Sequence, residues 1–372
     1  MHHITLTSLL VIAACGDNLA QEPDGGPDAQ GGAPHAVVVS GSFQAGEPGV
    51  MSALDLGTLQ VAQRVAPNGA VGSDPVLRRV DGELFVVNRA DGNNITVLDA
   101  TTFAVKEQLA TGAGSNPQDV AVVGTKLYVP SLGTAGVVVV TRGSAEITTI
   151  SLASLDLDGK PDCVSAFRVG NDVYVACGML DENFTARGPG KVVVIDSSTD
   201  TVRATITLAN TNPFGMFEQM PASVGGALVI PTVPSFGDFS VGCVEKIRPG
   251  ATPAVDGCVV TNQSVNGIVS RIEFQDLGAL KVQWMVVTSF DTEPHGNLQG
   301  FDLVTNCLWP APLSPPTQVL VDVTVCPNEQ LVVADQTAAA NGLRVYDGGS
   351  ETTTSALSIG LLPGSTRGLV CY

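Results

Sequence analysis

A hairpin pattern recurs along the chain and constrains the fold more than any other feature of the sequence. Three copies are clear: SDPVLRRVDGELFVVN at 73–88, SNPQDVAVVGTKLYVP at 115–130 and KPDCVSAFRVGNDVYV at 160–175. Each contains a polar residue with Pro, an apolar run, a tight turn with Gly or Asn, and a second apolar run. This order of residues predicts two antiparallel strands joined by a short loop.

A second pattern follows the hairpins and consists of an apolar run, an Asp, a polar turn with Thr, and an alternating strand. It is clearest in ITVLDATTFAVKEQLATG at 95–112 and VVVIDSSTDTVRATITLAN at 192–210. Asp suits this place because its carboxylate can accept hydrogen bonds from the amides of the turn. The acids of the copies are Asp55, Asp99, Asp196, Asp302 and Asp347, while Thr141 replaces the Asp in one further copy and Glu245 marks a weaker one.

The copies number seven and follow one another at intervals of about 40–55 residues. Four strands in a unit of this length predict an all-β fold, a seven-bladed β-propeller. A TIM barrel would need amphipathic helices between strands, and a sandwich would not explain the period. The segment at 35–42 is expected to be a second strand and 363–372 a first strand. The C-terminal strand should therefore complete the first blade and remove an open sheet edge.

The units resemble the YVTN-type β-propeller repeats of bacterial surface and periplasmic proteins. The stretches VLDATTF and VIDSSTDTV, with LYVP and VYVA before them, carry this resemblance. It extends over roughly residues 36–372 and is poor in the fifth and sixth blades. The resemblance implies an architecture rather than an activity, because propellers host lyases, lactonases, redox subunits and binding modules.

The N-terminus has the pattern of an export signal. An apolar run from Leu6 to Ala14 is too short to span a bilayer and precedes Cys15. Its end, Ile12-Ala13-Ala14-Cys15, resembles the lipobox of bacterial lipoproteins, which implies that Cys15 is acylated and begins the mature protein. Gly16 resembles the residue that directs such proteins to the outer membrane. Residues 1–5 contain no Lys or Arg, and an ordinary signal peptide with an incidental Cys15 is the alternative.

These patterns divide the chain into a lipoprotein signal peptide at 1–14, a lipidated Cys with a disordered tether at 15–35, and a propeller domain at 36–372. The tether is rich in Gly, Pro, Asp, Ala and Gln and cannot bury enough apolar surface to fold. The net charge of −18 argues against a nucleic-acid partner and against direct contact with anionic membranes. The expected membrane contact is the lipid on Cys15 alone, and the expected state is a monomer.

Seven cysteines follow Cys15, which suits an exported protein. Cys163 and Cys177 are symmetric about Gly170, and Cys243 and Cys258 are symmetric about Gly250-Ala251, as opposed residues of a hairpin would be. Both pairs are expected to form disulfides. The other three cannot all pair, and the choice here is Cys307 with Cys326, which leaves Cys371.

Candidate site residues lie on the face that carries the loops entering each blade and the loops joining its second and third strands. We call this the loop face. His295 is the one His of the 36–372 domain, so a His-based copper, iron or zinc site is not expected. Arg367 should line the channel and pair with Asp74 or Asp119. The candidate ligand-binding residues are Arg89, Arg187, Asp291, Glu293, His295 and Arg367.

Two functional classes follow from these observations. The first is a lipoprotein of the cell envelope that presents the propeller as a binding or scaffold module to a protein or a polysaccharide. The second is a propeller hydrolase or lyase at the channel mouth, which would use carboxylates, His295 as general acid–base group and possible calcium assistance. The sequence names no other cofactor. The missing catalytic motifs favour the first class.

Overall fold

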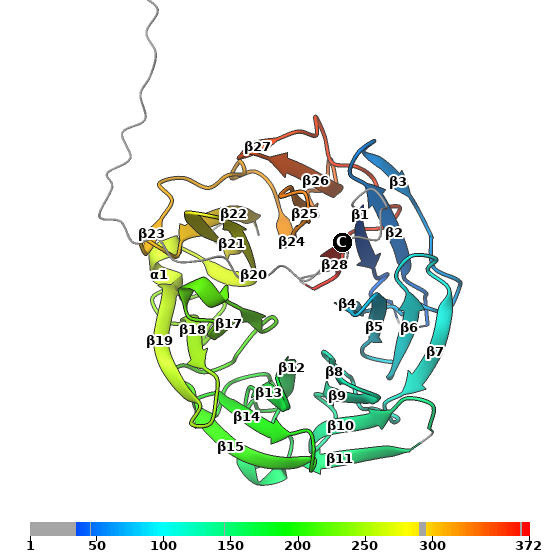
Figure 1. The fold of residues 1–372 in the computed structure, drawn as a ribbon, viewed down its shortest axis with the longest axis vertical. Coiled ribbons are helices and arrows are strands. Elements are labelled where there is room, and N and C mark those ends of the chain that lie inside the picture. Colours follow the sequence, from blue (N-terminus) through cyan, green and yellow to red (C-terminus); the bar gives the residue numbers. More distant parts are fainter. Residues whose placement is uncertain (1–34, 45, 145, 290–294, 365–366) are drawn as a thin grey trace, which may run out of the picture. The chain divides into compact units, whose positions relative to one another are not determined.

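The structure, a computed structural model, describes residues 35–44, 46–144, 146–289, 295–364 and 367–372. These residues belong to one compact unit, whereas the predicted signal peptide, Cys15 and nearly all of the tether lie outside the described residues. Seven four-stranded antiparallel sheets stand in a ring (Figure 1), which confirms the predicted seven-bladed β-propeller.

The first three blades show how the hairpin pattern is used, because each begins with an inner strand and ends with an outer one. Blade 1 contains β28 (Leu369–Cys371), β1 (His35–Ser40), β2 (Val50–Asp55) and β3 (Gln60–Ala62). Blade 2 contains β4 (Pro75–Val80), β5 (Glu83–Asn88), β6 (Asn94–Asp99) and β7 (Val105–Ala110). Blade 3 contains β8 (Ala121–Val123), β9 (Lys126–Pro130), β10 (Gly136–Thr141) and β11 (Ile147–Ser151).

The remaining four blades repeat this order without interruption. Blade 4 contains β12 (Cys163–Val169), β13 (Asp172–Cys177), β14 (Lys191–Asp196) and β15 (Thr201–Thr207). Blade 5 contains β16 (Glu218–Gln219), β17 (Leu228–Pro231), β18 (Cys243–Arg248) and β19 (Ala254–Thr261). Blade 6 contains β20 (Ile268–Leu277), β21 (Leu280–Ser289), β22 (His295–Asp302) and β23 (Cys307–Leu308), and blade 7 contains β24 (Leu320–Val325), β25 (Leu331–Asp335), β26 (Gly342–Asp347) and β27 (Ser350–Glu351).

Helical structure is short in the described residues. It consists of α1 (Asn262–Val265) and two 3-10 turns at Ala153–Leu155 and Ala222–Val224. In the described part of the chain, no helix has the length and apolarity that crossing a membrane would require.

The C-terminal strand closes the ring as predicted. Figure 1 shows β28 on the inner side of β1, and the two strands pair in register from Ala36 with Cys371 to Val38 with Leu369. The first strand begins at His35, one residue before the expected boundary, and the His35 ring packs edge-on against Tyr372 at 4.6 Å. Closure thus joins the two ends of the domain in one sheet.

Apolar side chains fill the space between neighbouring blades. Because side chains alternate between the two faces of a sheet, each blade packs on one face against the blade before it and on the other against the blade after it. Val38 shares a buried cluster with Val345 of blade 7, whereas Val37 shares one with Leu84 of blade 2. The described residues form seven such clusters, one for each interface between blades.

The acid that follows the third strand acts in the turn as expected. Asp99 accepts hydrogen bonds from the amides of Thr101 and Thr102 at 3.0 and 2.9 Å, and these bonds lower its pKa. Asp55, Asp196 and Asp302 make similar bonds. The weaker copy around Glu245 is confirmed as blade 5, but Glu245 is not its turn residue, because it lies within β18, which ends at Arg248. The Glu245 carboxylate is buried and accepts from the amides of Ala209 and Asn210 instead.

Two of the expected disulfides are confirmed and one is wrong. Cys163 pairs with Cys177 across the first hairpin of blade 4, and Cys243 pairs with Cys258 across the outer strands of blade 5. Cys326, however, pairs with Cys371 at a Cα separation of 5.0 Å, so that blade 7 is covalently joined to β28. Cys307 lies on the outermost strand of blade 6, where it is exposed and forms no disulfide. Three disulfides indicate an extracytoplasmic protein.

We expect the Cys326–Cys371 bridge to carry a large part of the closure energy. Replacing Cys371 with Ser should lower the free energy of unfolding by about 2–4 kcal/mol, because the bridge closes a loop of 45 residues. Denaturant unfolding measures this change. The matched control is Cys307→Ser, which should change stability by no more than about 0.5 kcal/mol. The opposite ranking of these two variants would restore the Cys307–Cys326 pairing.

Candidate functional site

The inner strands of the seven blades surround the central channel, and three of them are bent where they reach it. A β-bulge or register shift precedes Ser165 in β12, Arg271 in β20 and Asp322 in β24. Bulges of this kind redirect a side chain from the sheet face. The three redirected side chains are polar, and all three take part in contacts between blades.

Asp119 joins three blades through its two carboxylate oxygens. Arg78 of blade 2 donates from Nε to Oδ1 and from Nη2 to Oδ2, both at 2.8 Å. In blade 4, Ser165 Oγ and the amide of Ala166 donate to Oδ2 at 2.8 and 3.0 Å. Burial opposes ionisation of this fully buried carboxyl, yet Arg78 and Arg367 hold its pKa below the usual value.

Asp322 repeats this arrangement on the other side of the ring. Arg271 of blade 6 donates from Nε to Oδ1 at 2.9 Å. Oδ2 accepts from the consecutive amides of Arg367, Gly368 and Leu369 at 2.8, 2.7 and 3.0 Å. The Asp322 carboxylate therefore holds the C-terminal strand by accepting hydrogen bonds from three consecutive backbone amides.

Further contacts join these two units into a continuous ring. The amide of Phe217 in blade 5 donates to Ser165 Oγ at 2.9 Å, and the neighbouring Glu218 accepts from Arg271 at 2.5 Å. The amide of Leu77 donates to the carbonyl of Arg367 at 2.8 Å, which joins blade 2 to blade 1. We call this closed series of polar contacts the inner ring. It passes through all seven blades.

The charges of the inner ring support one another. Burial alone would lower the pKa of Arg271, but Glu273, Glu218 and Asp322 raise it above the ordinary value. Burial raises the pKa of Glu273, which shares Arg271 with the other two carboxylates. Most of these groups serve as partners for one another, so the inner ring joins the blades.

The structure brings Arg89 and Arg367 together at one end of the channel. Arg89 donates from Nη2 to Asp74 at 2.5 Å and from Nη1 to the Gln118 side chain at 3.4 Å. Arg367 donates from Nη1 to the main-chain carbonyls of Gln118 and Val164, at 3.2 and 2.9 Å. The expected pairing of Arg367 with Asp74 or Asp119 is wrong, because these acids are bonded to Arg89 and Arg78.

The other predicted residues do not join this pair in the structure. Arg187 is bound to Asp156 and Asp158 at 3.1 and 3.0 Å, within the loop face of blade 4. Close by in sequence, burial raises the pKa of Asp162 to about 6. His295 begins β22 opposite Ser289 and is partly buried.

The acidic part of the loop at 289–297 is not tested. Asp291 and Glu293 lie outside the described residues. Where the structure describes the chain, no group of three or more His, Cys, Asp or Glu is arranged to hold a metal ion. Calcium assistance therefore stays a prediction.

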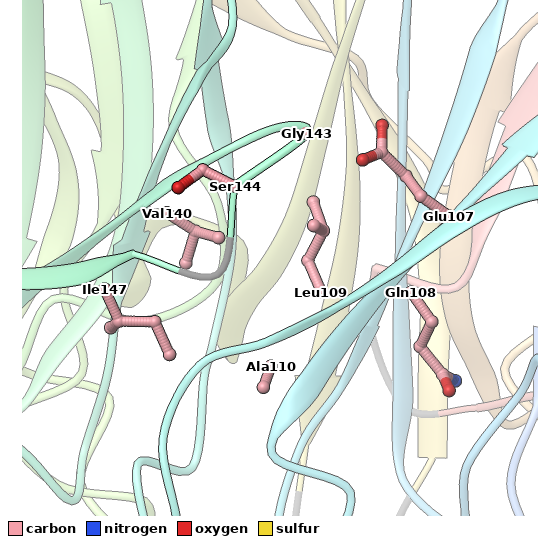
Figure 2. A pocket seen from close by; sticks show the side chains of 8 residues that line it. All are labelled: Glu107, Gln108, Leu109, Ala110, Val140, Gly143, Ser144 and Ile147. Atoms are coloured by element: carbon pink, nitrogen blue, oxygen red, sulfur yellow. The ribbon is translucent and has the colours of Figure 1, made fainter.

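Two cavities lie near the surface of the described residues. One of about 280 Å³ opens on the loop face and is lined by Phe43, Ser73, Asp74, Ala90 and Asp91. The other, of about 360 Å³, lies between the outer strands of blades 2 and 3, and Figure 2 shows its lining of Glu107, Gln108, Leu109, Ala110, Val140, Gly143, Ser144 and Ile147. The first borders Arg89 through Asp74, whereas no residue predicted from sequence lines the second.

The inner ring was missed by sequence reasoning although a signal exists. Asp119 and Asp322 each stand before Val at the start of an inner strand, in DVAVV at 119–123 and DVTV at 322–325. Each also accepts the amide of the following Val. The partners Arg78 and Arg271 are 41 and 51 residues away, a separation at which sequence gives no pairing.

Comparison with known proteins supports the fold alone. No protein-family model matches the sequence, and no curated protein sequence matches it. The structure is similar to a putative 6-phosphogluconolactonase from Bacteroides fragilis (TM-score 0.62, 11% identity, 93% of this chain and 99% of that one). It is also similar to apo AztD from Citrobacter koseri (TM-score 0.54, 11% identity, 91% and 98%) and to the beta-propeller domain of Myceliophteria thermophila Cps50 (Swd1) (0.55, 12%, 80% and 89%). These structural similarities support the propeller fold, but at such low sequence identity they say nothing about activity.

The inner ring can be tested by comparing a buried ion pair with an exposed one of the same geometry. Asp119→Asn should lower the free energy of unfolding by about 3–5 kcal/mol, because it leaves Arg78 buried without its carboxylate. Asp172 binds Arg203 through the same two nitrogens but is 24% exposed, so Asp172→Asn should cost about 0–1 kcal/mol. Equal losses of stability in the two variants would show that the Arg78–Asp119 pair contributes no more to stability than a more exposed ion pair does.

Proposed function

We propose that this protein is an exported binding module whose loop face contacts a protein or polysaccharide partner. The observation that carries the proposal is the placing of its exposed phenylalanines. Phe43, Phe184 and Phe236 are 53%, 68% and 48% exposed, and all three lie in loops between the second and third strands of a blade. Aromatic side chains are enriched among the residues that carry most of the binding energy at interfaces.

Other exposed apolar residues support the same face. Leu157 and Leu362 lie in loops that enter a blade, and Val241 lies in the loop that also carries Phe236. In topological order these residues fall into two sectors. Leu157, Phe184, Phe236 and Val241 belong to loops of blades 4 and 5, whereas Phe43 and Leu362 belong to loops of blade 1. The larger sector is the better candidate for the centre of contact.

Two of these phenylalanines have an unusual backbone conformation. Phe43 has φ of 56° and Phe184 has φ of 59°, in the left-handed region that residues other than glycine rarely adopt. Such conformations are held by their surroundings and are common at recognition sites. Asp181, for example, accepts from the amides of Asn183 and Thr185, which flank Phe184. A loop fixed before binding loses less entropy when a partner docks.

Anchoring by lipid is the second part of the proposal. The lipobox-like sequence before Cys15 supports acylation, Gly16 supports the outer membrane, and the three disulfides support an oxidising compartment. A tether of small and acidic residues would hold the propeller away from the lipid surface.

The role of the loop face can be tested with two matched sets of substitutions. Replacing Phe43, Phe184 and Phe236 with Ser should reduce crosslinking to envelope partners at least about tenfold, with melting nearly unchanged. The control replaces Val105, Val202 and Val304, which are similarly exposed but lie away from this face. Crosslinks that persist in the first set, or disappear equally in both, would contradict the proposal.

The anchor can be tested by fractionation of cells. Cys15→Ser should move the protein from the membrane fraction to the soluble fraction, because the acyl attachment site is lost. Labelling with a radioactive fatty acid provides the control, since the wild-type protein should be labelled and the variant should not. A variant that still sediments with membranes would rule out the lipid as the anchor.

A further inference from the structure

We propose that the guanidinium edge formed by Nε and Nη2 of Arg367 is the binding site for a carboxylate that reaches it through the channel. This inference goes beyond the proposed function, because it does not depend on the exposed phenylalanines. It rests on the hydrogen bonds, the burial and the backbone of Arg367.

Arg367 differs from every other deeply buried arginine in the described chain. Three arginines there are more than nine-tenths buried: Arg271, Arg344 and Arg367. Arg271 contacts three carboxylates and Arg344 contacts two, whereas no carboxylate of the described residues lies within 4.0 Å of the Arg367 guanidinium. A buried charge without a counter-ion is strongly unfavourable, so an external anion is the expected partner.

One edge of the Arg367 guanidinium makes no hydrogen bond with the described residues. Both hydrogen bonds of its guanidinium leave from Nη1, and Nε is buried without a partner. In two other arginines of this protein, Nε and Nη2 together form the edge that binds a carboxylate. Arg78 holds Asp119 through these atoms at 2.8 Å and 2.8 Å, and Arg203 holds Asp172 through them at 3.1 and 2.7 Å. The same planar, bidentate chemistry assigns a carboxylate to Arg367.

Both arginines and aspartates surround Arg367, and the arginines have the larger effect on its pKa. Burial lowers the pKa of Arg367 to about 9, and the charges of Arg89 and Arg78 lower it further than Asp119 and Asp74 can offset. Arg89 also has a buried Nε with no partner. Unsatisfied donors of this kind call for an ion or a water molecule, and two neighbouring cations favour the ion.

The backbone also marks this residue. Arg367 has φ of 97°, which is unusual for a residue other than glycine, and its amide is held by Asp322. Strain that the surrounding structure maintains is typical of ligand sites. Gln118 contacts both arginines, and Asp74, the partner of Arg89, lines the cavity on the loop face.

The experiment measures acetate binding to the purified protein by titration calorimetry at constant ionic strength. The wild-type protein should bind acetate saturably at one site, and Arg367→Lys should weaken binding at least about tenfold, because Lys keeps the charge but lacks the bidentate edge. Arg203→Lys is the matched control. It makes the same change where the edge is already filled by Asp172, and it should leave acetate binding unaltered.

Further arms separate a carboxylate site from general anion effects. Chloride and inorganic phosphate at equal ionic strength should bind more weakly than acetate. If Arg367→Lys fails to fold, Arg89→Gln replaces it and should weaken binding several-fold, because the second cation is lost. Absence of saturable acetate binding, equal binding of chloride or phosphate, an equal loss in Arg203→Lys, or wild-type affinity in Arg89→Gln would each overturn the proposal.

Discussion

The inner ring of polar contacts is the interaction on which the rest of the propeller depends. Asp119 and Asp322 each accept an arginine from the preceding blade and backbone amides from the following one. Since inner strands converge on the channel, their first amides cannot all be paired within a sheet, and a buried amide without a partner is costly. Asp119 and Asp322 accept hydrogen bonds from such amides on two sides of the ring. Contacts of Ser165, Glu218 and the Arg367 carbonyl complete the inner ring.

The inner ring and the apolar layers have complementary roles. The seven layers between blades supply non-directional burial, which would tolerate a shift of one blade against the next. The charged pairs fix register, because each has one geometry. At the interface where the ring closes, a covalent bond is added. There β28 is held by Asp322, by pairing with β1 and by the Cys326–Cys371 bridge. The groups of the inner ring have hydrogen-bond partners around the channel, whereas Nε of Arg367 has none among the described residues.

Much of the fold could be predicted from the sequence, because the patterns that indicate it involve residues close together in the chain. Hairpins at 73–88, 115–130 and 160–175, the Asp-capped turns and the symmetric Cys pairs all involve residues close in the chain. Contacts between distant residues could not be read in this way. Cys326 pairs with Cys371 rather than Cys307 because ring closure brings β28 beside β24, and Glu245 fails as a turn residue because it is inside a strand. The partners of Arg367 could not be predicted either, because they depend on which aspartates Arg78 and Arg89 already bind.

The inner ring makes the seven blades one cooperative unit, and the loop face is the proposed recognition surface. Native-state hydrogen exchange tests this most directly at the amides of Gly368 and Leu369, which donate to Asp322. Their opening free energy should equal that of global unfolding, as measured on the buried strands of blades 3 to 5. Exchange of these amides through a local opening of much lower free energy, with the other blades still protected, would contradict the claim.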